Sequence, residues 1–138
     1  MNIALIAHDK KKEIMTQFCI AYCGILSKHK LYATSTTGKV VSEATGLPIH
    51  RHLSGSQGGV EQIKAKITYN EIDLLLYFKD QSFTAKEEAH FLQLINACDG
   101  QNVPVATNIA TAEMLILGLN RGDLDWRELI NPQSFSVT

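Results

Sequence analysis

The sequence predicts an α/β fold, in which residues 1–138 form a single three-layer domain around a central, mostly parallel, Rossmann-like sheet of about five strands. The continuous apolar segments 2–7 and 72–78 are typical of parallel strands that are buried on both faces. Segments of helical periodicity follow the predicted strands, and this alternation repeats about five times. With 138 residues and 45% hydrophobic content, the chain is long enough to enclose one substantial core.

The elements are expected in a regular order along the chain. Strands are predicted at residues 2–7, 31–33, 49–53, 72–78 and 103–106. Helices are predicted from residue 10 to about 25, after the loop 54–59, and at 39–45, 86–98, 113–119 and 124–130. Asp9 is placed to cap the first helix, and Gly100 to end the helix that starts at residue 86. Residues 132–138 are expected to form a loose tail.

Composition excludes several classes of partner. The 13 basic and 14 acidic residues give a net charge of −1, so we expect no nucleic-acid partner and no polybasic membrane surface. No apolar segment is long enough to cross a bilayer, and no leader is recognisable. Of three cysteines, Cys19 and Cys23 lie four residues apart on one predicted helix, which favours reduced thiols in the cytoplasm. A metal bound by this pair is conceivable, but a buried free cysteine is the commoner arrangement.

Two hydroxyl- and glycine-containing loops follow predicted strands. In the first, Thr34 to Thr37 supply four hydroxyls and Gly38 allows amides to converge on an anion, although a simple helix cap would have the same composition. The second loop is residues 54–59. Other strand ends carry His8, Asp9 and Asp80, and such ends meet at one edge of a parallel sheet. The sequence therefore predicts a binding site for a small phosphorylated ligand.

Two histidines lie outside this pattern. His50 and His52 alternate along the predicted strand 49–53, where they could be ligands or acid–base groups. A solvated strand edge explains the same spacing. We expect neither a metal ion nor an organic cofactor.

Several segments resemble those of methylglyoxal synthases. They are Ile3–Lys12 (IALIAHDKKK), Leu31–Gly38 (LYATSTTG), Leu53–Gly55 followed by Gly58 and Gly59, and Val103–Asn108 (VPVATN). The resemblance covers nearly the whole chain and implies a homohexamer that converts dihydroxyacetone phosphate to methylglyoxal and phosphate. It assigns phosphate and substrate binding to Lys12, Thr34, Thr36, Thr37, Gly38, Ser54 and Gly55, with His8, Asp9 and Asp80 in the same pocket.

The chain departs from the family at the positions that move protons. Val60 replaces the aspartate that acts as the family's base, and Glu61 follows one residue later. By alignment, Glu87 replaces a catalytic histidine, and His90 replaces a second catalytic aspartate. Ser35 stands where the family usually has glycine, which narrows the space against the ligand.

Two functions therefore follow from the sequence. The main hypothesis is a catalytically degenerate protein that keeps the phosphate site and binds a phosphorylated small molecule or a nucleotide-derived ligand, for sensing or sequestration. The alternative is an active lyase that uses a substitute acid–base group. The candidates for that role, which the sequence alone leaves open, are Asp9, Glu61, Asp80, Glu87 and His90.

Overall fold

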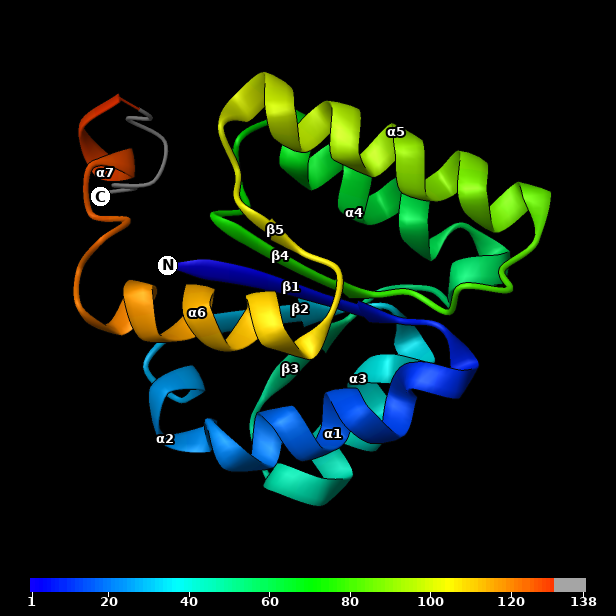
Figure 1. The fold of residues 1–138 in the computed structure, drawn as a ribbon, viewed down its shortest axis with the longest axis horizontal. Coiled ribbons are helices and arrows are strands. Elements are labelled where there is room, and N and C mark those ends of the chain that lie inside the picture. Colours follow the sequence, from blue (N-terminus) through cyan, green and yellow to red (C-terminus); the bar gives the residue numbers. More distant parts are fainter. Residues whose placement is uncertain (131–138) are drawn as a thin grey trace.

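A five-stranded parallel sheet forms the centre of the molecule in a computed structural model that describes residues 1–130 (Figure 1). The strand order is β3-β2-β1-β4-β5. The strands are β1 (Asn2–Ala7), β2 (Lys30–Ala33), β3 (Ile49–Arg51), β4 (Leu74–Phe78) and β5 (Val105–Ala106). The predicted fold class is confirmed, since neighbouring strands are parallel throughout.

Helices cover both faces of the sheet and make the three layers. Figure 1 shows α1, α2, α3 and α6 on one face and α4 and α5 on the other. The helices are α1 (Lys12–Ala21), α2 (Cys23–Leu26), α3 (Ser35–Thr45), α4 (Gly59–Thr68), α5 (Ala85–Gln101), α6 (Ile109–Asn120) and α7 (Arg127–Ile130). Two short 3-10 helices, η1 (Asp9–Lys11) and η2 (Gly55–Gln57), lie at the end of the sheet that forms the site.

The central strand β1 shows why its sequence is continuously apolar. Ile3 and Leu5 pack into the core beneath α1, α3 and α6, whereas Ala4 and Ile6 pack into the core beneath α4 and α5. Successive side chains of a strand point to opposite faces, so a strand covered on both faces must be apolar at every position. Strand β4 divides its side chains between the two cores in the same way.

Helix α3 begins earlier than the sequence predicted. The prediction started this helix at residue 39, but the helix includes Ser35, Thr36 and Thr37, with Thr34 as its N-cap residue. Serine and threonine have modest helix propensity because their hydroxyls compete for backbone groups. Here the Thr37 hydroxyl accepts a hydrogen bond from the Ala7 amide at 3.2 Å, which anchors the first turn against the end of β1.

Other boundaries also differ from the prediction. Asp9 does not cap α1, because it lies within η1 and the N-cap residue is Lys11. Gly100 does not end α5; the helix continues to Gln101, and Asn102 takes the left-handed conformation (φ 56°) that closes it. Helix α6 begins at Ile109, since the Asn108 side chain caps it by accepting the Thr111 amide.

Within residues 1–130, none of the helices is long and apolar enough to cross a membrane. Cys19, Cys23 and Cys98 are free thiols. The loose tail predicted for residues 132–138 lies outside the described residues.

Candidate active site

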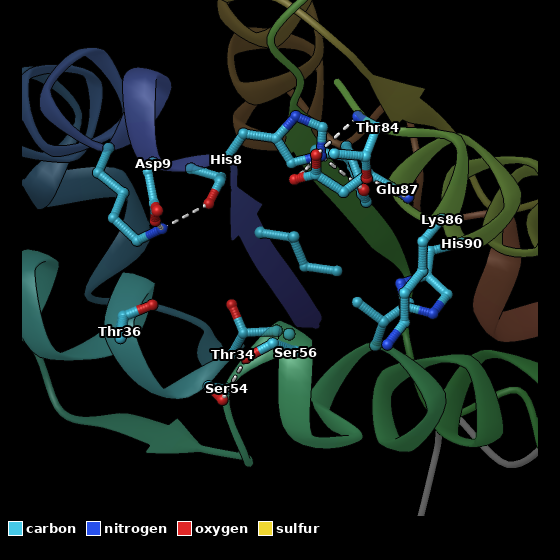
Figure 2. Close-up of a pocket in the computed structure, with 16 residues that line it drawn as sticks. His8, Asp9, Thr34, Thr36, Ser54, Ser56, Thr84, Lys86, Glu87 and His90 are labelled. Atoms are coloured by element: carbon cyan, nitrogen blue, oxygen red, sulfur yellow. Dashed lines mark hydrogen bonds and ion pairs between the residues drawn. The ribbon is translucent and has the colours of Figure 1, made fainter. Parts of the chain in front are cut away.

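A cavity of about 520 Å³ opens at one edge of the sheet. It is bordered by the carboxyl ends of β1 and β4 and by the loops that follow β2 and β3. Its polar wall combines hydroxyls, two lysines, carboxylates and histidines from segments far apart in the sequence (Figure 2). The residues that line it are Ile6, Ala7, His8, Asp9, Lys12, Thr34, Thr36, Ser54, Gly55, Ser56, Val60, Tyr77, Thr84, Lys86, Glu87 and His90. The predicted convergence of strand ends thus brings most of the candidate residues together.

Lys12 is the cation of the cavity wall nearest to the end of β1. Its ammonium donates to the Ala7 carbonyl at 2.9 Å and to Asp9 Oδ1 at 2.7 Å, and these two hydrogen bonds fix the position of the ammonium. An ammonium has three donors, so one remains for a bound anion. The hydrogen bond from Lys12 also lowers the pKa of the Asp9 carboxyl.

The first turn of α3 supplies a second set of hydrogen-bond donors near the cavity. Ser35 donates its amide to the Leu53 carbonyl, and Gly38 makes the first helical bond to the Thr34 carbonyl. The amides of Thr36 and Thr37 lie between them, in the turn where a helix has no internal acceptor and a positive end. The side chains of Thr34 and Thr36 line the cavity directly. A phosphate is the type of ligand that such a turn stabilises.

Thr37 and Gly38, predicted to bind phosphate, are not among the residues that line the cavity, and both make structural contacts. The Thr37 side chain is fully buried, and its hydroxyl bonds to the backbone at Ala7. Gly38 faces the side chain of Arg51, where a Cβ would lie 2.6 Å from Arg51 Cγ. A side chain at position 38 would therefore displace Arg51, so the close packing of α3 on β2 and β3 favours glycine here, and a role of Gly38 in phosphate binding stays a prediction.

The second predicted loop reaches the cavity through Ser54 and Gly55. The Gly59 and Gln57 amides donate to the Ser54 carbonyl, which folds the loop over itself. A Cβ at Gly59 would lie 1.9 Å from the Leu53 carbonyl oxygen, so only glycine fits there. Gly58 has φ 102°, which also favours glycine. These two glycines therefore shape the loop that presents Ser54.

His8 is held as one neutral tautomer at the end of β1. The Asp80 amide donates to His8 Nδ1 at 2.9 Å, and an amide can only donate, so Nδ1 carries no proton and Nε2 does. Nε2 lies 3.0 Å from the Tyr77 hydroxyl and 3.7 Å from Glu87 Oε2. Burial lowers the pKa of His8, which keeps the ring neutral. Nε2–H therefore donates to the Tyr77 hydroxyl, and an oxygen that enters the cavity would compete for this proton.

Glu87 faces His8 from the first turn of α5, whereas Asp80 does not line the cavity. Glu87 Oε1 accepts the Thr84 amide, and the Thr84 hydroxyl accepts the Glu87 amide, forming a capping box. This hydrogen bond from the Thr84 backbone lowers the pKa of Glu87. The Asp80 carboxylate binds Ser82 and approaches Lys10, so Asp80 contributes to the site through its backbone amide.

Glu61 and His90 meet across the contact between α4 and α5. His90 Nε2 lies 3.0 Å from Glu61 Oε1. His90 lines the cavity, whereas Glu61 lies behind it and is not part of the wall. Of the five acid–base candidates, Asp9, Glu87 and His90 therefore line the cavity, and Glu61 and Asp80 contact residues that do.

Sequence reasoning missed four polar residues of the wall: Ser56, Tyr77, Thr84 and Lys86. Tyr77 lies within an apolar strand segment, which gave no sign of a role for its hydroxyl. The position of Thr84 at the start of a helix could have been predicted, because Thr84 and Glu87 have the spacing of a capping box.

His50 and His52 lie on the edge strand β3 and its continuation, outside the cavity wall. Their rings pack against each other at 4.9 Å between centroids, and the His52 ring stacks on Tyr32. Across residues 1–130, no group of three metal-binding side chains comes together. His50 is exposed at the strand edge, whereas His52 is half-buried and its Nε2 has no hydrogen-bond partner among the described residues, so the solvated-edge interpretation describes His50 and not His52.

The fold and the cavity together define a parallel α/β domain whose sheet edge carries a cavity lined by hydroxyls, lysines, carboxylates and histidines. A family model described as "MGS-like domain" matches residues 16–107. The chain is 57% identical over 133 residues to methylglyoxal synthase from Caldicellulosiruptor saccharolyticus, covering 96% of this chain and 94% of that protein. Methylglyoxal synthase from Oceanobacillus iheyensis is 53% identical over 130 residues, covering 94% of this chain and 93% of that protein.

A solved structure supports the same family assignment. The crystal structure of methylglyoxal synthase from Elizabethkingia anophelis superimposes with a TM-score of 0.74 at 33% identity, covering 83% of this chain and 76% of that chain. The chain belongs to the methylglyoxal synthase family.

These comparisons overturn the main functional hypothesis from the sequence. Relatives that are 57% and 53% identical over most of the chain are methylglyoxal synthases, which favours the alternative of an active lyase over a degenerate binding protein. The inference of lost chemistry rested on single aligned positions, chiefly Val60. The candidates that the sequence offered as substitutes, His90 and Glu87, line the same cavity as His8, so acid–base groups remain there despite the valine.

Proposed function

We propose that the protein is a methylglyoxal-forming lyase, which converts dihydroxyacetone phosphate to methylglyoxal and inorganic phosphate. The observation that carries this proposal is the division of one cavity into two chemically different parts. In Figure 2, Asp9, Thr34, Thr36, Ser54 and Ser56 gather on one side, and Thr84, Lys86, Glu87 and His90 on the other. The methylglyoxal synthases among the relatives support the choice of reaction.

The hydroxyl side suits the phosphate group of the substrate. Lys12, the first turn of α3 and the Ser54 loop all offer donors to the same volume. A phosphate dianion gains charge-assisted hydrogen bonds there that a neutral three-carbon sugar would lack. The phosphate therefore fixes the substrate's orientation, and its carbon chain extends toward His8 and α5.

The acid–base side suits the removal of a proton from carbon. A base takes a proton from the hydroxymethyl carbon next to the carbonyl, and the electron pair moves onto the carbonyl oxygen to give an enediolate. His8, with its proton on Nε2, is placed to donate to that oxygen as its charge develops.

The enediolate then expels the phosphate. The carbon–oxygen bond to phosphate breaks, its electron pair leaves with the phosphate, and the remaining enol tautomerises to methylglyoxal. Atoms and electrons balance without water, an oxidant or a reductant.

The test is to incubate the purified protein with dihydroxyacetone phosphate and to measure methylglyoxal and inorganic phosphate together. Equal amounts of the two products are expected. Phosphate released with dihydroxyacetone would identify a phosphatase, and no release of either product would refute the proposal.

A matched pair of lysine variants tests the assignment of the phosphate side. Lys12→Ala removes a donor from the cavity wall, so the affinity for inorganic phosphate should fall by about 10-fold or more, as for the loss of one charge-assisted hydrogen bond. Lys10→Ala removes an exposed lysine outside the wall and should leave that affinity unchanged. Isothermal titration calorimetry measures both. Equal affinities in the two variants would place the phosphate elsewhere.

A further inference from the structure

The contact between Glu61 and His90 offers an acid–base pair where the aligned family residues differ. Glu61 comes from α4 and His90 from α5, and these helices pack directly against each other. The carboxylate oxygen and Nε2 are 3.0 Å apart, and only 14% of the His90 side chain is exposed. The His90 ring reaches the same cavity wall as Val60, whereas the Glu61 side chain, 53% exposed, stays outside it.

The other carboxylates near the cavity are engaged in hydrogen bonds that weaken them as bases. The Asp9 carboxylate accepts a hydrogen bond from the Lys12 ammonium, and the Glu87 carboxylate accepts one from the Thr84 amide. The Asp80 carboxylate accepts hydrogen bonds from the amide and the hydroxyl of Ser82. In each case the hydrogen bond stabilises the ionised carboxylate and lowers its pKa, so the carboxylate accepts a proton less readily. His8 is also unsuited as the base, because the lone pair on Nδ1 already accepts a hydrogen bond from the Asp80 amide.

We propose that His90 is the base that removes the proton from carbon, and that Glu61 is the residue that positions it. This inference rests on the proposed lyase activity and names the group that performs its first step. A carboxylate next to Nε2 favours the tautomer with the proton on that nitrogen. Nδ1 then keeps a lone pair that can accept a proton, in the manner of other histidine–carboxylate pairs.

The step is balanced as follows. The carbon–hydrogen bond of the hydroxymethyl group breaks, the proton binds Nδ1 of His90, and the electron pair forms the enediolate. The imidazolium faces the Glu61 carboxylate, which offsets its positive charge. After phosphate has left with its electron pair, His90 returns its proton to solvent and the site is restored.

Variants of the pair test this assignment through turnover of dihydroxyacetone phosphate. His90→Gln should lower kcat by about 10²- to 10⁴-fold, the range typical for the loss of a general base, with little change in KM. Glu61→Gln should lower kcat by about 10-fold, because its amide oxygen can still accept a hydrogen bond from His90 Nε2 but no longer offsets the charge of the imidazolium, and Glu61→Asp should recover part of that loss. Glu88→Gln, on the exposed side of α5 and outside the cavity wall, is the control and should retain the parent kcat.

The double variant separates positioning from an independent role. If Glu61 acts through His90, Glu61→Gln should have no further effect in a protein that already carries His90→Gln. A second independent loss would make Glu61 a base in its own right and overturn the inference. In His90→Gly, added imidazole should restore turnover, which no merely structural role of His90 would produce.

Two further outcomes separate this inference from the proposed function. A parent enzyme that forms methylglyoxal, together with a His90→Gln variant of equal kcat, refutes the inference and leaves the function intact. A parent that forms no methylglyoxal refutes the function itself. Calorimetry with inorganic phosphate verifies that each variant is folded, and His90→Asn replaces any His90 variant that fails this check.

Discussion

At the scale of single residues, the neutral state of His8 links the chemistry of the site to the stability of the fold. Burial is the main cause that lowers its pKa, while Glu87 and Asp80 oppose the effect and Lys12 adds to it. In the unfolded chain a histidine titrates near pH 6.5. As the pH falls below about 6.5, the unfolded state therefore binds a proton that the folded state does not. The folded state loses stability in this range and keeps it above.

We predict that His8→Gln reduces this acid sensitivity, to which His29 and His52 also contribute because burial lowers their pKa. The free energy of unfolding of the parent should decrease with falling pH below about 6.5, and each histidine with a lowered pKa can add up to about 1.4 kcal/mol per pH unit to the slope. The variant should show a flatter dependence than the parent, and the difference between the two slopes is the contribution of His8. Urea unfolding at a series of pH values measures this. Parallel curves for parent and His8→Gln would contradict the prediction.

The sequence indicated some residues of the site and could not indicate others. Thr34 and Ser54 were readable because hydroxyls that follow a strand end must lie at the sheet edge where ligands bind. Tyr77 was not, since its hydroxyl reaches His8 only through the three-dimensional pairing of β1 with β4. The sequence indicated Glu61 and His90 as two separate candidates. It could not indicate their contact, which depends on how α4 and α5 pack.

At the scale of elements, the capping box of α5 positions the acid–base side of the cavity. Thr84 and Glu87 exchange hydrogen bonds at 2.9 and 3.1 Å, which satisfies two amides at the start of a helix that also carries His90. A cap of this kind fixes the first turn, and therefore the direction in which Glu87 faces His8. The same residues thus serve helix stability and site geometry.

We predict that Thr84→Ala destabilises the protein by about 1 kcal/mol, the usual cost of losing an N-cap hydroxyl. It should also lower kcat, because Glu87 is no longer held in place. Thr84→Ser keeps the hydroxyl and should retain both properties. Urea unfolding and turnover assays provide the two measurements, and a Thr84→Ala variant as stable as Thr84→Ser would show that the cap contributes nothing.

The sequence predicted the existence of the elements better than their ends. The strands β1 and β4 were evident because burial on both faces leaves a continuous apolar segment. The start of α3 was missed because its first turn is stabilised by a contact from Thr37 to the end of β1, and not by local propensity. The end of α5 was missed because Asn102, and not Gly100, adopts the left-handed conformation.

At the scale of the whole molecule, Arg127 joins the final described helix to the amino-terminal end of the sheet. Its side chain is fully buried and donates to Asp73 Oδ1 at 3.1 Å and to Asn70 Oδ1 at 3.0 Å. It also donates to the backbone carbonyls of Gln101, Asn102 and Ile72. The turns before β4 and after α5 are therefore held together by one guanidinium, whose planar set of donors lysine cannot reproduce.

We predict that Arg127→Ala destabilises the fold by about 3–5 kcal/mol, because it leaves a buried carboxylate and several carbonyls without this donor. Arg121→Ala is the matched control. Arg121 forms an exposed pair with Asp123 at 2.8 Å, and such pairs contribute at most about 1 kcal/mol. Both values come from urea unfolding. Equal effects of the two substitutions would show that the buried network is not a principal source of stability.

The last prediction concerns self-association, for which the resemblance to the family implies a homohexamer. On α6, Met114 and Leu117 lie three residues apart on one face and are 74% and 43% exposed, and Ile20 of the neighbouring α1 is 52% exposed. Figure 1 shows these two helices on the same side of the sheet, and the hydroxyl of Tyr22, which follows α1, donates to Glu113 in the second turn of α6. Large apolar side chains gathered on adjacent helices are the kind of surface that a partner subunit covers.

We propose that this surface of α1 and α6 is buried in the assembly. Light scattering coupled to gel filtration should give the parent a mass about six times that of the 15.3 kDa chain. Met114→Glu should shift the mass to smaller species, because a carboxylate would lose its hydration in the interface. Leu92→Glu, at a 57% exposed position of α5 on the opposite face, should keep the parent mass. A monomeric parent would refute the assembly. A parent assembly that only Leu92→Glu dissociates would move the interface to α5.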